Sequence, residues 1–141
     1  MKKYVTKENG LRLVAVLLGL FFIYAGAKKL FVPPEPRTDG HSTVPAEFID
    51  LIRAFKGSGY FMIMVAWFQL TAGALLLWKR TMLIGALLLL PVTFNIFAIH
   101  VALDNRMGDY IFTGILLAAN SAIVLTYLRQ LILPARLKTA A

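Results

Sequence analysis

The chain has 141 residues, of which 59% are hydrophobic and 16% charged, and its formal net charge is +8. Soluble domains carry about a quarter charged residues, so this composition argues against a soluble domain and indicates a membrane protein. The basic residues fall in short groups between long apolar segments, which is typical of membrane topology and lipid contact rather than of nucleic acid binding. The lack of cysteine excludes disulfides, Fe–S ligation and thiolate zinc sites, and the two histidines are too far apart for a haem or metal motif.

The first predicted membrane helix covers residues 10–31 and follows a basic head. Its length of about 33 Å is enough to cross a bilayer. A cleaved signal peptide is the alternative, because residues 25–27 (Ala-Gly-Ala) resemble a cleavage site, but the apolar run exceeds the usual limit of about 15 residues. Ala15, Gly19 and Gly26 are spaced so that a second helix could approach closely.

A proline-rich loop at residues 32–45 precedes a short helix predicted at residues 46–56. Apolar residues recur in it with helical spacing, opposite charged residues, and the helix is too short to span a membrane. The apolar set is Phe48, Leu51, Ile52 and Phe55. An interfacial anchor is the simpler interpretation of this amphipathic helix, and a lid is the alternative.

Three further crossings are predicted at residues 60–78, 81–103 and 110–130, and Pro134 is expected to break the last helix. The tight turn at residues 79–80 makes the second and third crossings antiparallel neighbours. The expected fold is therefore all-α: one membrane domain over residues 1–141, a four-transmembrane-helix bundle with an amphipathic helix in its first extracytoplasmic loop.

Basic residues give the expected orientation. Nine lie on the side that holds both termini and the 79–80 turn, against six on the other side, which also holds six of the seven acidic residues. Because cytoplasmic loops carry an excess of Lys and Arg, both termini are expected in the cytoplasm and the 32–59 segment outside. The expected location is the cytoplasmic (inner) membrane.

Polar side chains inside the predicted helices indicate a ligand pocket. At a rise of about 1.5 Å per residue, two lie near the middle of the membrane, two about 5 Å outward and three roughly 10 to 12 Å outward. In that order they are Gln69 and Asn120, then Tyr24 and Asn95, then Lys28, His100 and Thr113. Polar residues in lipid need partners, so these seven predict a pocket that opens toward the outer face.

Each of these residues also has a structural interpretation. Intramembrane amides commonly hold helices together by hydrogen bonds, and Asn95 could bond the backbone near Pro91. Lys28 could extend to the lipid headgroups. His100 lies one helical turn before Asp104, so the two could form a simple interfacial pair or a proton relay to a ligand.

Three apolar motifs resemble those of the DoxX-like family of small four-helix membrane proteins. They are Arg12, Gly19, Gly26 and Lys28 in the first helix, Gly59-Tyr60 followed by GALLLWKR (73–80) in the second, and GALLLLPV (85–92) followed by His100 in the third. The resemblance covers most of the chain. It implies a link to a thiosulfate:quinone oxidoreductase subunit and to redox-associated membrane complexes. Family members often have a glutamate where this chain has Gln69, which weakens any mechanism that needs a proton-shuttling carboxylate there.

Two functions from different classes are expected to compete. The first is a quinone- or redox-partner-associated subunit, in which Lys28 and His100 hold a quinone carbonyl near Tyr24, Phe94 and Phe97. The chain shows no flavin, haem or metal motif, so its electrons would come from a partner and it would not be catalytic alone. The second is a non-catalytic protein that binds a lipid or small amphiphile or assists membrane-protein assembly. The sequence supports a channel or transporter less well than these two functions, because it shows no pair of broken helices and no ring of charged residues.

Overall fold

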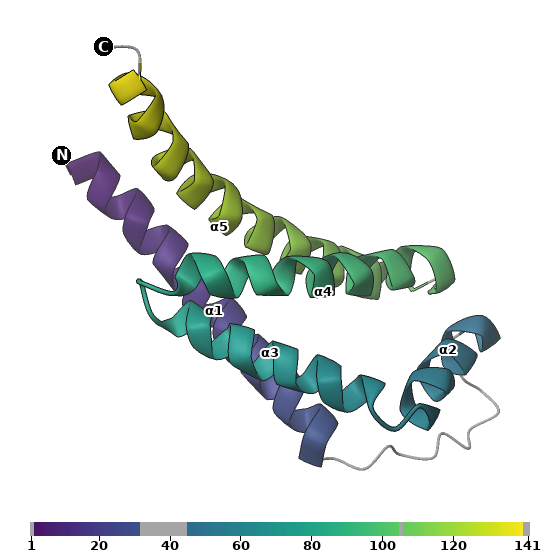
Figure 1. Ribbon diagram of the computed structural model, residues 1–141. Coiled ribbons are helices and arrows are strands. Elements are labelled where there is room, and N and C mark those ends of the chain that lie inside the picture. Colours follow the sequence, from purple (N-terminus) through teal and green to yellow (C-terminus); the bar gives the residue numbers. More distant parts are fainter. Residues whose placement is uncertain (1, 32–44, 105, 140–141) are drawn as a thin grey trace.

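The computed structural model describes residues 2–31, 45–104 and 106–139, and this part of the chain is helical and contains no strand. Five helices follow in order: α1 (Lys2–Phe31), α2 (Ala46–Gly57), α3 (Phe61–Leu77), α4 (Met82–Leu103) and α5 (Met107–Thr139). The beginning of α1, the end of α5 and the α3–α4 turn lie at one end of the molecule (Figure 1). We call the other end, where α2 lies beside the α4–α5 connection, the α2 end.

In the part of the chain that the structure describes, three helical segments are long and apolar enough to cross a membrane: Asn9–Phe31, Met82–Leu103 and Met107–Arg129. A fourth crossing results if α2 and α3 count as one span, although they are bent by 88°. With 17 residues, α3 is only about 25 Å long, a little short of the roughly 30 Å hydrocarbon layer. Three or four apolar helices of this length among the described residues indicate a membrane protein.

Two of the helices extend beyond the predicted crossings. The helix α1 begins at Lys2 and not near residue 10, because the apolar run marks the part suited to lipid rather than the whole helix. The helix α5 continues through Pro134 to Thr139, so the predicted break at this proline was wrong. A proline removes one backbone hydrogen bond and crowds one carbonyl, which kinks a helix without having to end it.

The bundle consists of two closely packed helix pairs, α1 with α3 and α4 with α5, joined mainly through contacts between α3 and α4. Glycines allow the α1–α3 contact. A Cβ atom built on Gly19 would lie 2.8 Å from the backbone oxygen of Gly73, and one built on Gly26 would lie 2.8 Å from that of Ala66. Real Cβ atoms do not approach a backbone oxygen this closely. The two backbones can therefore lie this near each other only because Gly19 and Gly26 have no side chain.

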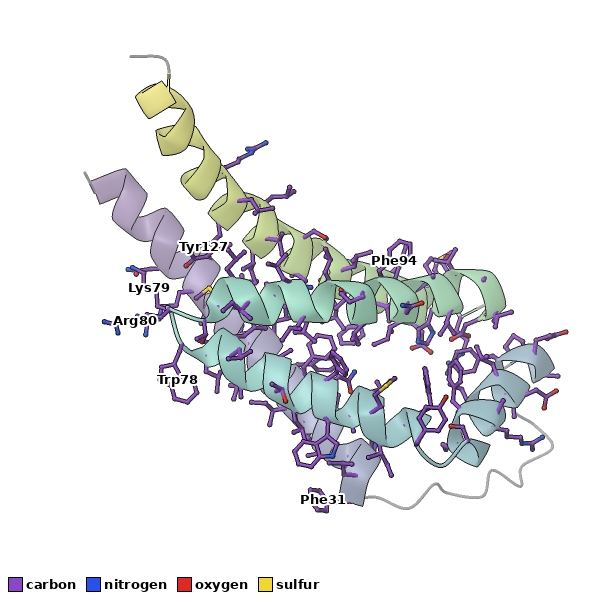
Figure 2. The ribbon with its side chains drawn as sticks, in the orientation of Figure 1. Phe31, Trp78, Lys79, Arg80, Phe94 and Tyr127 are labelled. Carbon is purple, nitrogen blue, oxygen red and sulfur yellow. The ribbon has the colours of Figure 1, made fainter. Side chains whose placement is uncertain are left out.

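Apolar side chains fill the interior and also cover much of the outside. The core combines small residues with larger ones from all four long helices: Ala15, Leu18, Phe22, Ala72, Leu76, Met82, Ala86, Leu89, Ile123 and Val124. On the outside, Leu13 is 60% exposed, Trp67 59% and Ile115 61%. The aromatic side chains of Phe31, Trp78 and Phe94 point away from the bundle (Figure 2). Such a surface suits contact with lipid rather than with water.

The helix α2 turns sharply into α3. Gly59 has a positive φ of 72°, which glycine adopts without strain, and the Ser58 hydroxyl accepts a hydrogen bond from the Phe61 backbone N–H. The rings of Phe55 and Phe61 stack at 4.4 Å across the turn. The charged residues of α2 are exposed while Phe48, Leu51, Ile52 and Phe55 are half-buried, so the apolar side of α2 faces the bundle.

Candidate functional site

A cavity of about 280 Å³ lies among α1, α3, α4 and α5. Most of its lining is apolar, and the rings of Phe21, Phe22 and Phe112 form one part of it. Phe21 makes edge contacts with both other rings, at centroid distances of 5.3 and 5.5 Å. The polar lining comes from five residues: Lys29, Gln69, His100, Asp109 and Thr113. An apolar pocket with a few polar groups is the usual form of a small-molecule site.

Lys29 and Gln69 form the polar contact that joins α1 to α3 in this cavity. The Lys29 ammonium donates a hydrogen bond of 2.9 Å to the Gln69 side-chain oxygen and a longer one of 3.4 Å to the Ala25 carbonyl. Gln69 is only 1% exposed, and Lys29 is half-buried. Both acceptors are neutral, so neither compensates the charge of the ammonium group.

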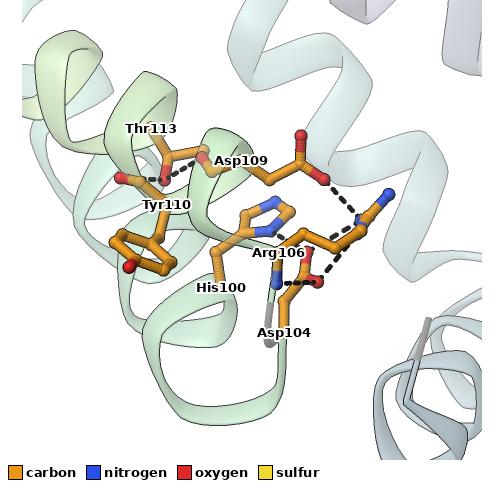
Figure 3. Close-up of polar contacts among 6 residues, drawn as sticks. All are labelled: His100, Asp104, Arg106, Asp109, Tyr110 and Thr113. Atoms are coloured by element: carbon orange, nitrogen blue, oxygen red, sulfur yellow. Dashed lines mark hydrogen bonds and ion pairs between the residues drawn. The ribbon is translucent and has the colours of Figure 1, made fainter. Parts of the chain in front are cut away.

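A second polar group, the Asp104 cluster, consists of His100, Asp104, Arg106 and Asp109 (Figure 3). The Asp104 carboxylate accepts two hydrogen bonds of 2.8 Å from the Arg106 guanidinium and a third, of 3.2 Å, from the Arg106 backbone N–H. His100 Nδ1 lies 2.7 Å from the same carboxylate, and Arg106 also forms an ion pair with Asp109. The cluster thereby fixes the α4–α5 connection against the last turn of α4 and the first turn of α5.

Charge and hydrogen bonding within the cluster keep Asp104 ionised. The side-chain hydrogen bonds from Arg106 lower the pKa of Asp104 far below its usual range, although burial opposes this, and His100 lowers it further. The same contact with Asp104 raises the pKa of Arg106. Asp104 has a fully buried side chain, so the arginine is the cation that compensates its charge.

Potential metal ligands also meet in the Asp104 cluster. His100, Asp104 and Asp109 each offer a ligand atom, and these atoms lie within 4.8 Å of one another. Arg106 is bonded to both carboxylates and supplies the positive charge there. The two carboxylates therefore share one guanidinium as their cationic partner within the protein.

Phe48 of α2 covers the Asp104 cluster. Its ring centroid lies 5.3 Å from that of His100, and the Arg106 guanidinium carbon lies 6.0 Å from the same centroid. A cation this close to an aromatic face is attracted to it. Since His100 also lines the cavity, Phe48 connects α2 to one wall of the cavity.

We expect Phe48→Ala to loosen the packing of α2 against the α4–α5 side of the bundle. Loss of the ring contact and of the cation–π contact should speed amide hydrogen exchange in α2 about tenfold. Glu47→Ala removes an exposed neighbour on the same helix and should leave the exchange unchanged. Equal exchange rates in the two variants would show that Phe48 does not hold α2.

The structure brings together three of the seven residues predicted to bind a ligand. Gln69, His100 and Thr113 line the cavity, although the Thr113 hydroxyl donates to backbone carbonyls of its own helix. Tyr24 is 66% exposed, and Lys28 is also exposed. Neither side chain lines the cavity, so the predicted grouping of these two with His100 is not what the structure shows.

The two asparagines have structural contacts outside the cavity. Asn95 is exposed and donates a hydrogen bond of 2.9 Å to the Pro91 carbonyl, one turn back on α4. Asn120 is fully buried and donates to the Ala86 carbonyl at 3.1 Å, which connects α5 to α4. Its side-chain oxygen has no partner among the described residues. Both patterns match the structural interpretation of intramembrane amides.

Sequence reasoning missed Lys29 and Asp109. Depth in the membrane predicted Lys28, but its side chain lies on an exposed face of α1. A better signal was available: Lys29 follows Phe22 by seven residues and Gly26 by three, so it shares the face on which α1 contacts its neighbours. Asp109 gave no such signal, because its position depends on the path of the α4–α5 connection.

Comparison of the chain with protein-family models, with curated proteins and with solved structures finds no match.

Proposed function

We propose that the protein crosses the membrane four times, with both termini in the cytoplasm and the α2 end outside. The support is the apolar exterior, the shared end of α1, α5 and the α3–α4 turn, and the excess of basic residues at that end. In this arrangement α3 is the short crossing, and α2 lies at the outer membrane surface with its charged side toward water.

The lack of cysteine makes this topology easy to test. Gly57→Cys and Arg80→Cys place single thiols at exposed positions at the α2 end and in the α3–α4 turn, respectively. A membrane-impermeant maleimide added to intact cells should label the first variant and spare the second until the membrane is opened. Labelling with the opposite pattern would reverse the proposed orientation.

We further propose that the cavity binds the polar end of a small amphiphile. This proposal is supported mainly by the Lys29 ammonium group, which lies in a mostly apolar cavity and whose two hydrogen-bond acceptors are neutral. A charged group in such surroundings is costly, and ionisable residues in membrane helices often mark ligand sites. The phenylalanine rings would contact the apolar part of the ligand while Lys29 and His100 face its polar end.

A quinone is the second candidate occupant. It is favoured by the placement of two hydrogen-bonding side chains, Lys29 and His100, in one cavity with Phe21, Phe22 and Phe112. A quinone offers two carbonyl acceptors and a flat ring that could lie against the phenyl groups. In that case the protein would hold the quinone for a redox partner, in keeping with the DoxX-like resemblance.

Analysis of the bound molecules tests this proposal. The purified protein should retain a lipid or quinone, identified by native mass spectrometry and by extraction. Ala25→Leu adds bulk to the cavity lining and should abolish retention, whereas Ala118→Leu at an exposed position of α5 should not. If both variants retain the same molecule as the parent protein, the molecule is bound elsewhere and the cavity is not its site.

A further inference from the structure

The Lys29 ammonium group has no anionic partner among the described residues. Its two hydrogen bonds go to the Gln69 side-chain oxygen and the Ala25 carbonyl. Asp109 is a carboxylate that lines the same cavity, but it is ion-paired with Arg106. We therefore propose that the ligand of this cavity carries an anionic head, of the carboxylate or phosphate class, which completes the ion pair with Lys29. This inference rests on the proposed amphiphile site and narrows its ligand class.

Gln69 fits the role of orienting Lys29 without neutralising it. An ammonium group has three donors, of which Gln69 takes one at 2.9 Å and Ala25 a second at the weaker distance of 3.4 Å. At least one donor is therefore left for a ligand. Because Gln69 is buried and its amide is neutral, it fixes the ammonium group in the cavity while the positive charge remains available.

Cavity size favours a ligand with one apolar chain. Small-molecule sites have volumes of about 300–1,000 Å³, and this cavity of about 280 Å³ lies just below that range. It has room for a head group and the first part of a chain beside the rings of Phe21, Phe22 and Phe112. The remainder of the chain would lie among the membrane lipids, against the apolar exterior of the helices.

Matched ligands with the same chain test the proposal. Dodecanoate, dodecyl phosphate and dodecanol differ in charge at the head, and acetate and inorganic phosphate provide the same anions without a chain. Binding is measured with the full protein in phosphatidylcholine nanodiscs and corrected for protein-free nanodiscs. A hydrogen bond to a charged group predicts that the two anionic amphiphiles bind at least about tenfold more tightly than dodecanol. The chainless anions are expected not to bind.

Two substitutions and a neighbouring control locate the charge effect. Lys29→Gln should weaken dodecanoate binding about tenfold or more and leave dodecanol unchanged. Gln69→Glu puts a carboxylate of the same shape beside the Lys29 ammonium group. By forming an internal ion pair, it should also weaken dodecanoate binding and leave dodecanol binding unchanged. Lys28→Gln removes the same charge one residue away, from an exposed side chain outside the cavity, and should have no effect.

The outcomes separate the two proposals. If no amphiphile binds, the proposed amphiphile site is wrong, and the anionic ligand with it. If dodecanol binds as tightly as the anions, the cavity is an amphiphile site but the anionic ligand is wrong. Equal losses in the Lys28 and Lys29 variants would indicate general attraction to a basic surface and overturn the inference, as would tight binding of chainless anions. Should Gln69→Glu fail to fold, as judged by gel filtration and circular dichroism, Lys29→Gln still decides the result.

Discussion

Asp104→Asn is expected to lower the free energy of unfolding by about 3 kcal/mol, the lower part of the range for removing one partner of a buried ion pair. The Asp104 side chain is fully buried and accepts hydrogen bonds from Arg106 and His100. Asparagine has the same shape, but its amide group would turn donors toward the Arg106 donors and leave the guanidinium without its main anion. Unfolding in detergent, by heat or by added SDS, measures the difference.

A matched control is available on α2. Asp50 also pairs with an arginine, Arg53, but at 3.4 Å and with 71% of each side chain exposed. Exposed pairs contribute little, so Asp50→Asn should change the free energy of unfolding by less than about 1 kcal/mol. Similar losses in the two variants would mean that the Asp104 cluster is no more important than a surface ion pair.

The pH dependence of this effect follows from the lowered pKa of Asp104. A carboxylate with a lower pKa in the folded than in the unfolded state stabilises the fold at pH values above the unfolded pKa, about 3.9. This stabilisation is lost as the pH falls toward the folded pKa. The difference in unfolding free energy between the parent protein and Asp104→Asn should therefore be constant above about pH 5 and shrink below about pH 4. A constant difference down to pH 3 would contradict the assignment of the effect to the Asp104 charge.

The helices could be predicted from the sequence because their determinants are local. Apolar runs of membrane length, bounded by glycine, proline and charged residues, give helices at nearly the predicted positions. The helix α3, at Phe61–Leu77, lies one residue inside each predicted bound. The predictions of helix ends were poorer, since an apolar pattern does not show how far a helix continues beyond the apolar run, as α1 does by beginning at Lys2.

The site was less predictable because it depends on rotation and on a connection between helices. An error of one residue changes the direction of a helical side chain by about 100°, which separates exposed Lys28 from Lys29 in the cavity. The pairing of His100 with Asp104 follows helical spacing and could be anticipated. The contacts of Arg106 could not, because its guanidinium returns to Asp104 only through the backbone path after α4.

The contact between α1 and α3 positions two of the polar residues that line the cavity. Lys29 belongs to α1 and Gln69 to α3, so their hydrogen bond depends on how closely these helices pack. The other polar lining residues belong to α4 and α5. A change in the spacing between α1 and α3 should therefore affect both stability and the position of the ammonium group.

Gly73→Ala tests this dependence and should destabilise the fold by about 1–3 kcal/mol, the usual cost of overpacking. The added Cβ would lie 2.7 Å from the Gly19 backbone oxygen and 3.1 Å from the Ile23 backbone nitrogen, so α1 and α3 must separate. Gly10→Ala makes the same chemical change in α1 with no atom within 4 Å, and alanine's higher helix propensity should make it neutral or stabilising. Only Gly73→Ala should lower the temperature of thermal unfolding and reduce the amount of amphiphile that the protein retains. An unaffected Gly73→Ala protein would show that the two backbones are farther apart than this packing requires.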